Sequence, residues 1–152
     1  MALQKFYPDC VLVAGAKDNC AGTTKPVGDS DRLSFGETHI SVIETPCHTG
    51  GHVVYLIHSR PPPLEGDLYA YGHEIEAALT GDCLFIGGVG AFFHGGEADM
   101  HQCIKNLAWV GDQCLVFCGH EYTVRSGPPE VESRLSSKLV QSRVVTSAQP
   151  HG

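Results

Sequence analysis

The stretch TPCHTGGH runs from Thr45 to His52 and places two histidines between two apolar segments. Residues 39–45 alternate apolar and polar side chains, and residues 53–57 (VVYLI) are β-branched and aromatic. Both patterns predict β-strands. We therefore expect His48 to lie in a loop directly after a strand, where side chains of a layered α/β domain often converge on a ligand.

Two later segments repeat this design. TGDCLF (residues 80–85) places Asp82 after an apolar run, and CGHEYT (residues 118–123) places His120 after another. Imidazole nitrogens and carboxylate oxygens together suit Zn, Fe or Mn. One such segment is weak evidence, because a lone Gly-His in a loop is more often surface or core than ligand. Three segments with ligand-type residues at equivalent positions are stronger evidence, and together they indicate a metal site.

Further apolar runs complete an α/β pattern. Short β-branched and aromatic runs predict strands, and Gly36-Glu37 marks a hairpin turn between two of them. Apolar positions at helical spacing predict one helix over residues 97–110. The predicted strands are residues 10–14, 32–35, 39–45, 53–57, 77–80, 84–86 and 115–118.

Three segments lack such patterns. Residues 15–31 are rich in Gly, Thr, Asp and Asn and are predicted to be a loop. Residues 59–72 contain three consecutive prolines and are predicted to be an exposed insertion loop. Residues 126–152 show no convincing period. The prediction is one domain over residues 1–125, followed by a disordered tail.

Composition excludes several classes of protein. With 42% hydrophobic and 18% charged residues, the chain of 152 residues is globular rather than disordered. Its net charge of -7 argues against nucleic acid as a partner. No stretch approaches the ~20 apolar residues of a membrane span. Seven cysteines without a signal peptide indicate reduced thiols. We expect a cytoplasmic protein, with the mitochondrion as the alternative compartment.

Four motifs in order, TPCHTGGH, TGDCLF, GVGAFF and CGHEYT, carry a family resemblance. Together they resemble the glyoxalase II (hydroxyacylglutathione hydrolase) branch of the metallo-β-lactamase superfamily over about residues 5–123. The resemblance implies part of an αββα sandwich. It also implies that His48 binds one metal, Asp82 bridges two metals, and His120 binds the second. Zn is the expected metal, with Fe or Mn as alternatives.

The same resemblance implies a reaction and a substrate. A metal-bound hydroxide would attack the thioester carbonyl of S-D-lactoylglutathione or of a related thioester, while the metals stabilise the developing oxyanion. Asp82 would be catalytic through this centre. Tyr122 and Phe93 would contact the substrate, a small-molecule thioester of glutathione or a similar thiol.

The chain departs from the family at the metal site. It contains no H-x-H sequence, whereas the family's first motif, T-H-x-H-x-D-H, supplies four metal ligands. Three of seven protein ligands remain, so the chain is expected to be truncated and to lack the first strands of the sandwich. It is also expected to lack the C-terminal helical domain. His52 could substitute as a ligand, but a structural role is the better prediction for it.

The carrier site departs as well. The family usually has a lysine where this chain has Ala91, and Phe93 has no hydroxyl to donate. Losing a cation weakens the binding of glutathione carboxylates. Three hypotheses follow: a thioester hydrolase; an inactive truncated paralogue or isoform with a partial or vacant metal site, acting as a binding or regulatory protein; or a partial subunit that self-associates through its incomplete sheet.

Overall fold

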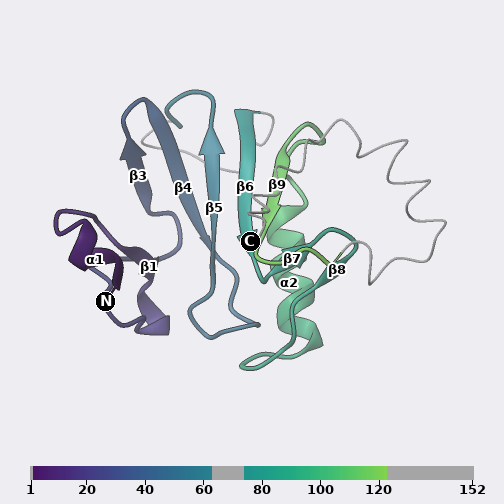
Figure 1. Cartoon of the computed structure of the whole chain (residues 1–152). Helices are drawn as coiled ribbons and strands as arrows, with labels where there is room; N and C mark the ends of the chain where they lie inside the picture. The colour runs from purple at the N-terminus through teal and green to yellow at the C-terminus, as the bar shows by residue number, and fades with distance from the viewer. Residues whose placement is uncertain (1, 63–73, 123–152) are drawn as a thin grey trace, which may run out of the picture.

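The structure, a computed structural model, describes residues 2–62 and 74–122 (Figure 1). Its main feature is a mixed sheet of five strands in the order β3-β4-β5-β6-β9. Strands β3 to β6 pair antiparallel, and β9 pairs parallel with β6 after a crossover that contains helix α2. The bounds are β3 Arg32–Phe35, β4 Thr38–Glu44, β5 Val53–His58, β6 Ile75–Gly81, β9 Leu115–Cys118 and α2 Glu97–Leu107.

The predicted strands of this sheet are confirmed. Strands β3 and β9 have the predicted bounds, and β4 and β5 differ from them by one residue. Strand β6 extends beyond residues 77–80 at both ends. The predicted hairpin joins β3 to β4 through Gly36, whose φ of +58° is a left-handed conformation that glycine adopts without strain. The sheet therefore follows directly from local patterns.

Helix α2 covers one face of the sheet and forms the core with it. Met100, Cys103 and Leu107 lie at helical spacing and are at most 8% exposed. They belong to one cluster with Val54 and Leu56 of β5, which are completely buried. Burying one large aliphatic side chain contributes about 1.5–3 kcal/mol. These side chains hold the helix on the sheet.

Helix α2 is shorter than the predicted range of residues 97–110. It ends at Leu107. The amides of Ala108 and Val110 each donate to the carbonyl three residues earlier, at 3.2 and 3.1 Å. Such bonds tighten the last turn and end a helix. The apolar period of the sequence continues past Leu107, which explains why the predicted helix was three residues too long.

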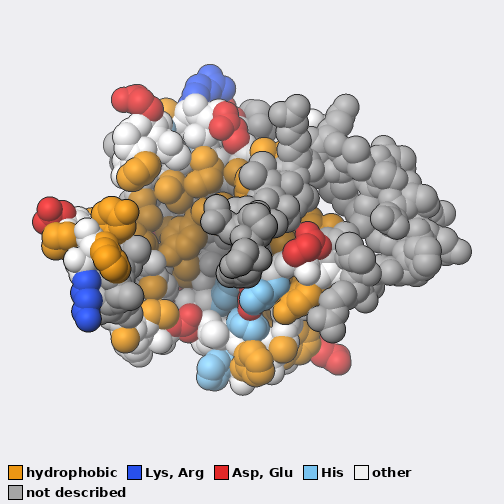
Figure 2. All heavy atoms as spheres, in the orientation of Figure 1, with side chains coloured by type: hydrophobic (Ala, Val, Ile, Leu, Met, Phe, Trp, Pro, Cys, Tyr) orange, Lys and Arg blue, Asp and Glu red, His pale blue; other side chains and the backbone are white. Residues whose placement is uncertain are grey.

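The opposite face of the sheet is apolar and partly exposed. The strand register places Tyr55 beside Leu79, and Leu79 beside Phe117. Leu79 is 39% exposed, and the other two are half-buried. Figure 2 shows hydrophobic side chains gathered over β3, β4 and β5 on one face. Within the part of the chain that the structure describes, this face has no covering layer comparable to α2.

The N-terminal segment and the glycine-rich region differ most from the predictions. Part of the predicted loop 15–31 forms a strand, and the predicted strands 10–14 and 84–86 are shifted or shortened. Elements of two to five residues carry no apolar period, so long-range hydrogen bonds decide them. The elements are α1 Ala2–Phe6, β1 Val13–Gly15, the 3-10 helix η1 Ala16–Asp18, β2 Lys25–Val27, β7 Leu84–Phe85 and β8 Gly88–Val89.

Several other predictions meet the structure only in part. The predicted tail 126–152 and most of the predicted insertion loop 59–72 lie outside the described residues. No helix within the described ranges is long and apolar enough to cross a membrane. All seven cysteines are described, and each is a free thiol.

Candidate metal centre

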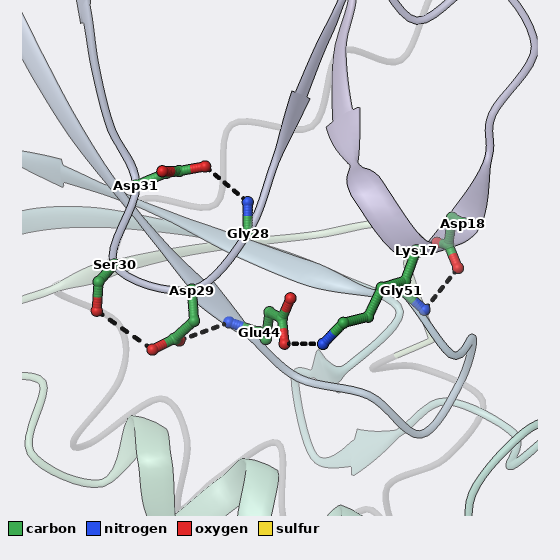
Figure 3. A network of polar contacts seen from close by, with 8 residues as sticks. All are labelled: Lys17, Asp18, Gly28, Asp29, Ser30, Asp31, Glu44 and Gly51. Atoms are coloured by element: carbon green, nitrogen blue, oxygen red, sulfur yellow. Dashed lines mark hydrogen bonds and ion pairs between the residues drawn. The ribbon is translucent and has the colours of Figure 1, made fainter.

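The loop that carries His48 is anchored by the N-terminal segment. The Gly51 amide donates a hydrogen bond of 2.7 Å to the carboxylate of Asp18. Figure 3 shows this contact together with an ion pair between Lys17 and Glu44, the last residue of β4. A Cβ atom on Gly51 would lie 2.2 Å from the Asp18 nitrogen, so only glycine permits this approach. His48 therefore extends from a loop that is tied down on both sides.

The imidazole of His48 is held by a backbone carbonyl. Its Nδ1 atom lies 2.9 Å from the oxygen of Ala91. A carbonyl only accepts, so Nδ1 donates, and a neutral ring then carries its lone pair on Nε2. That atom lies 3.2 Å from Oδ2 of Asp82. Two lone pairs at this distance repel each other unless a proton or a metal ion lies between them.

Asp82 is positioned by the turn that ends β6. Gly81 has a φ of +52°, and its oxygen accepts a hydrogen bond of 2.8 Å from the Gly119 amide. The Asp82 amide donates to Nε2 of His52 at 3.3 Å. A Cβ atom on Gly119 would lie 2.2 Å from Oδ1 of Asp82, so the carboxylate packs directly against backbone. The turn leaves Oδ2 facing the histidines.

His120 reaches the same carboxylate from the neighbouring strand. Strands β6 and β9 are parallel, so their carboxyl ends meet at one edge of the sheet. The Nε2 atom of His120 lies 3.4 Å from Oδ2 of Asp82, the oxygen that also faces His48. The His120 ring stacks on Tyr122, with centroids 5.4 Å apart. Figure 2 shows histidine side chains grouped beside the hydrophobic face.

These groups line a pocket of about 440 Å³. Its walls are aromatic. The rings of Phe85 and Tyr122 meet edge-to-face with their centroids 5.0 Å apart, and the centroids of the Phe93 and His48 rings are also 5.0 Å apart. No lysine or arginine lines the pocket within residues 2–62 and 74–122. Asp82 is therefore the carboxylate in a largely apolar, aromatic cavity.

The structure brings all five predicted site residues to this pocket: His48, Asp82, Phe93, His120 and Tyr122. Their roles as metal ligands and substrate contacts stay predictions. Sequence reasoning missed three contributors. Phe85, within TGDCLF, could have been found from that motif. No sequence signal marks the Ala91 carbonyl or the backbone approach at Gly119.

Comparisons with known proteins give the family. The chain is 36% identical over 126 residues to the cytoplasmic hydroxyacylglutathione hydrolase of Arabidopsis thaliana, covering 82% of this chain and 45% of that protein. It is 33% identical over 117 residues to the hydroxyacylglutathione hydrolase of Dictyostelium discoideum, covering 76% and 40%. Over the part that it spans, the chain belongs to the hydroxyacylglutathione hydrolase family. The chain thus spans less than half the length of these two relatives.

Solved structures confirm the metallo-β-lactamase fold. A metallo-β-lactamase from Staphylococcus aureus superposes with a TM-score of 0.61 at 16% identity, covering 98% of this chain and 48% of that one. ETHE1 from Myxococcus xanthus gives 0.61 at 22%, covering 95% and 62%. These identities establish the fold alone. No protein-family model matches the chain.

The donor set of this hydroxyacylglutathione hydrolase relative fits part of a metal centre. Zinc ligands at bond lengths of about 2.0–2.2 Å and tetrahedral angles lie about 3.3–3.6 Å from one another. The 3.2 and 3.4 Å separations at Asp82 are close to that spacing. However, no group of three or more His, Cys, Asp or Glu side chains in the described ranges could hold a metal ion. The residues therefore form two imidazole–carboxylate pairs that share one oxygen.

Burial controls the remaining ionisable groups near the site. It lowers the pKa of His52, with a further contribution from His48, which keeps the His52 ring neutral. Burial also raises the pKa of the Cys47 and Cys83 thiols, the neighbours in sequence of His48 and Asp82. Neutral buried thiols are poor nucleophiles. The chemistry of the site therefore rests on its histidines and carboxylate.

Proposed function

We propose that this chain forms part of a metal-dependent thioester hydrolase of the hydroxyacylglutathione hydrolase type. One observation carries the proposal: Nε2 of His48 and Nε2 of His120 both face Oδ2 of Asp82 inside an aromatic pocket. The names of the relatives support the reaction class. Because the chain spans less than half of those two relatives, the activity of the whole protein is part of the proposal.

His48, Asp82 and His120 would supply part of the ligand set of a two-metal centre: each histidine would hold one ion, and the carboxylate of Asp82 would be shared between the two. A bound divalent ion supplies a Lewis acid and lowers the pKa of its water to about 7. The remaining ligands would have to come from polypeptide outside the described residues or from another chain. Zn is the first candidate, and Fe or Mn also suits these donors.

The pocket would hold a small-molecule thioester. Phe85, Phe93 and Tyr122 present aromatic faces that can pack against the acyl group or its thiol carrier. Tyr122 lines the pocket and is 37% exposed, so its side chain would meet the carrier at the mouth of the pocket. S-D-lactoylglutathione is the substrate to test first. The cytoplasm is the proposed compartment, by analogy with the Arabidopsis thaliana relative.

Metal analysis combined with a hydrolysis assay tests the proposal. Purified protein is expected to bind metal and to hydrolyse S-D-lactoylglutathione, and His48→Ala and His120→Ala should each abolish turnover and lower the metal content. His101→Ala, an exposed histidine on α2, is the matched control and should change neither. Metal binding without turnover would favour the alternative, an inactive protein with a partial site. Wild-type protein without metal or turnover would overturn the proposal.

A further inference from the structure

We propose that His52 is a positioning residue that aims the carboxylate of Asp82 at His48 and His120. The inference deepens the proposed function and rests on it for its significance. His52 does not line the pocket, so it cannot contact a substrate there. It instead contacts the backbone of Asp82, because the Asp82 amide donates to Nε2 of His52 at 3.3 Å. Its influence on the site must therefore pass through that residue.

The hydrogen bonds of His52 fix one tautomer. An amide only donates, so Nε2 of His52 must carry the lone pair, and Nδ1 must carry the hydrogen. Nδ1 lies 2.8 Å from the hydroxyl oxygen of Thr45, which accepts that hydrogen. Thr45 is 1% exposed, so water does not compete for this contact. With both ring nitrogens engaged, His52 has no lone pair left for a metal ion, and the structural role predicted for it is favoured.

The turn beside His52 leaves little freedom for the carboxylate. A Cβ atom on Gly81 would lie 3.0 Å from Nε2 of His52, so the ring packs against the glycine itself. On the other side, Gly119 donates to the Gly81 oxygen and lies against Oδ1 of Asp82. The turn is thus held between an imidazole and a backbone. Because the backbone of Asp82 is fixed, its Oδ2 atom is directed at the histidines.

Two substitutions of similar size separate the hydrogen bond from simple packing. His52→Leu removes the acceptor, whereas His52→Gln retains an acceptor oxygen and a donor. Thr45→Val and Thr45→Ser form a second pair, which removes or keeps the hydroxyl that accepts from Nδ1 of His52. His58→Leu is the control, because His58 is also buried but bonds to Ser41 instead of the Asp82 turn. Circular dichroism identifies any variant that fails to fold.

The first measurement is zinc affinity by competition with a chelator. His52→Leu and Thr45→Val are expected to weaken affinity about 10- to 100-fold, as loss of an orienting partner typically does. His52→Gln, Thr45→Ser and His58→Leu should stay within about threefold of wild type. Should His52→Leu bind zinc as wild type does while His48→Ala does not, the positioning role is wrong and the proposed metal site stands. If His52→Leu is unfolded, the Thr45 pair decides.

The second measurement does not require metal. Hydrogen exchange of the Asp82 amide should accelerate about tenfold or more in His52→Leu and little in His52→Gln, because the amide loses its acceptor. If wild-type protein binds no zinc, the proposed function fails, and this exchange rate alone decides the inference. Unchanged exchange in His52→Leu would overturn it whatever the metal content.

Discussion

The Nε2 atom of His48 lies 3.2 Å from the Oδ2 atom of Asp82, and Nδ1 of His48 is bonded to a backbone carbonyl. With Nδ1 donating to that carbonyl, the remaining nitrogen Nε2 faces a carboxylate oxygen that His120 also approaches. A proton or a metal ion between Nε2 of His48 and Oδ2 of Asp82 would stabilise this arrangement, because the two lone pairs otherwise repel each other.

The first prediction concerns the shared oxygen. Asp82→Asn should lower zinc affinity by more than about 100-fold, beyond the 10- to 100-fold typical of a lost orienting partner. The metal-free variant should unfold at a temperature no lower than wild type, because the amide can donate to the lone pair of His48. Chelator competition and thermal unfolding check the two parts. A metal-free variant that unfolds well below wild type would mean that a proton already bridges Asp82 and the histidines.

A second prediction concerns the carrier. Ala91 lines the pocket. Its backbone carbonyl accepts the hydrogen bond from His48, and a substitution of the side chain leaves that carbonyl in place. Ala91→Lys should strengthen glutathione binding up to about fivefold at low ionic strength, since an accessible charge pair contributes about 0.2–1 kcal/mol. Titration calorimetry in low and high salt measures the gain, which should disappear at high salt. Ala91→Gln, of similar length without charge, should give no gain.

A third prediction concerns acid stability. Burial, aided by Arg32, lowers the pKa of His58, and burial also lowers that of His52. The unfolded chain then binds more protons than the folded one below about pH 6.5, so stability is complete above that pH and falls on acidification. Each histidine contributes a slope of up to about 1.4 kcal/mol per pH unit. Chemical unfolding of metal-free protein at several pH values measures it.

A matched variant assigns that slope. His58→Leu combined with Ser41→Ala removes the ring and the buried hydroxyl that bonds to it, so neither partner is left alone. Within the described residues, Nδ1 of His58 has no hydrogen-bond partner, so the double substitution breaks no further hydrogen bond of the ring. The double variant should show a flatter pH dependence. An unchanged slope would mean that His58 does not titrate on unfolding.

A fourth prediction concerns thiol reactivity. Cys20 is exposed and should react first with a thiol reagent, followed by Cys10 and Cys118. The buried cysteines should react only after unfolding, because burial raises the pKa of Cys103 to about 12 and of Cys114 to about 11. Timed labelling followed by mass spectrometry identifies each site. Rapid native labelling of Cys103 would contradict the packing of α2.

The fifth prediction concerns the partly exposed sheet face. Apolar sheet faces pack against other sheets, so we expect the chain to self-associate through the face that contains Tyr55, Leu79 and Phe117. Sedimentation should show mass increasing with concentration, and Leu79→Lys should reduce it. Val11→Lys, at an exposed apolar residue outside the sheet, should not. Equal effects of both substitutions would exclude this face as the contact.

The sequence by itself determined the sheet, the helix and the family. Strand alternation, helical spacing and turn glycines are local signals, so β3, β4, β5, β9 and α2 were all predictable. The order of four short motifs was enough to recognise the hydroxyacylglutathione hydrolase resemblance. That resemblance also singled out His48, Asp82 and His120, each of which follows a predicted strand.

Only the tertiary structure decided how those residues meet. Short elements such as β2 and β8 depend on partners far away in the chain and leave no period to detect. The orientation of Asp82 depends on His52, Thr45 and a backbone approach at Gly119, none of which is a local property. Hydrogen-bond geometry exists only after packing has fixed the backbone. The sequence identified the candidate ligands, and the fold placed Nε2 of His48 and Nε2 of His120 against one oxygen of Asp82.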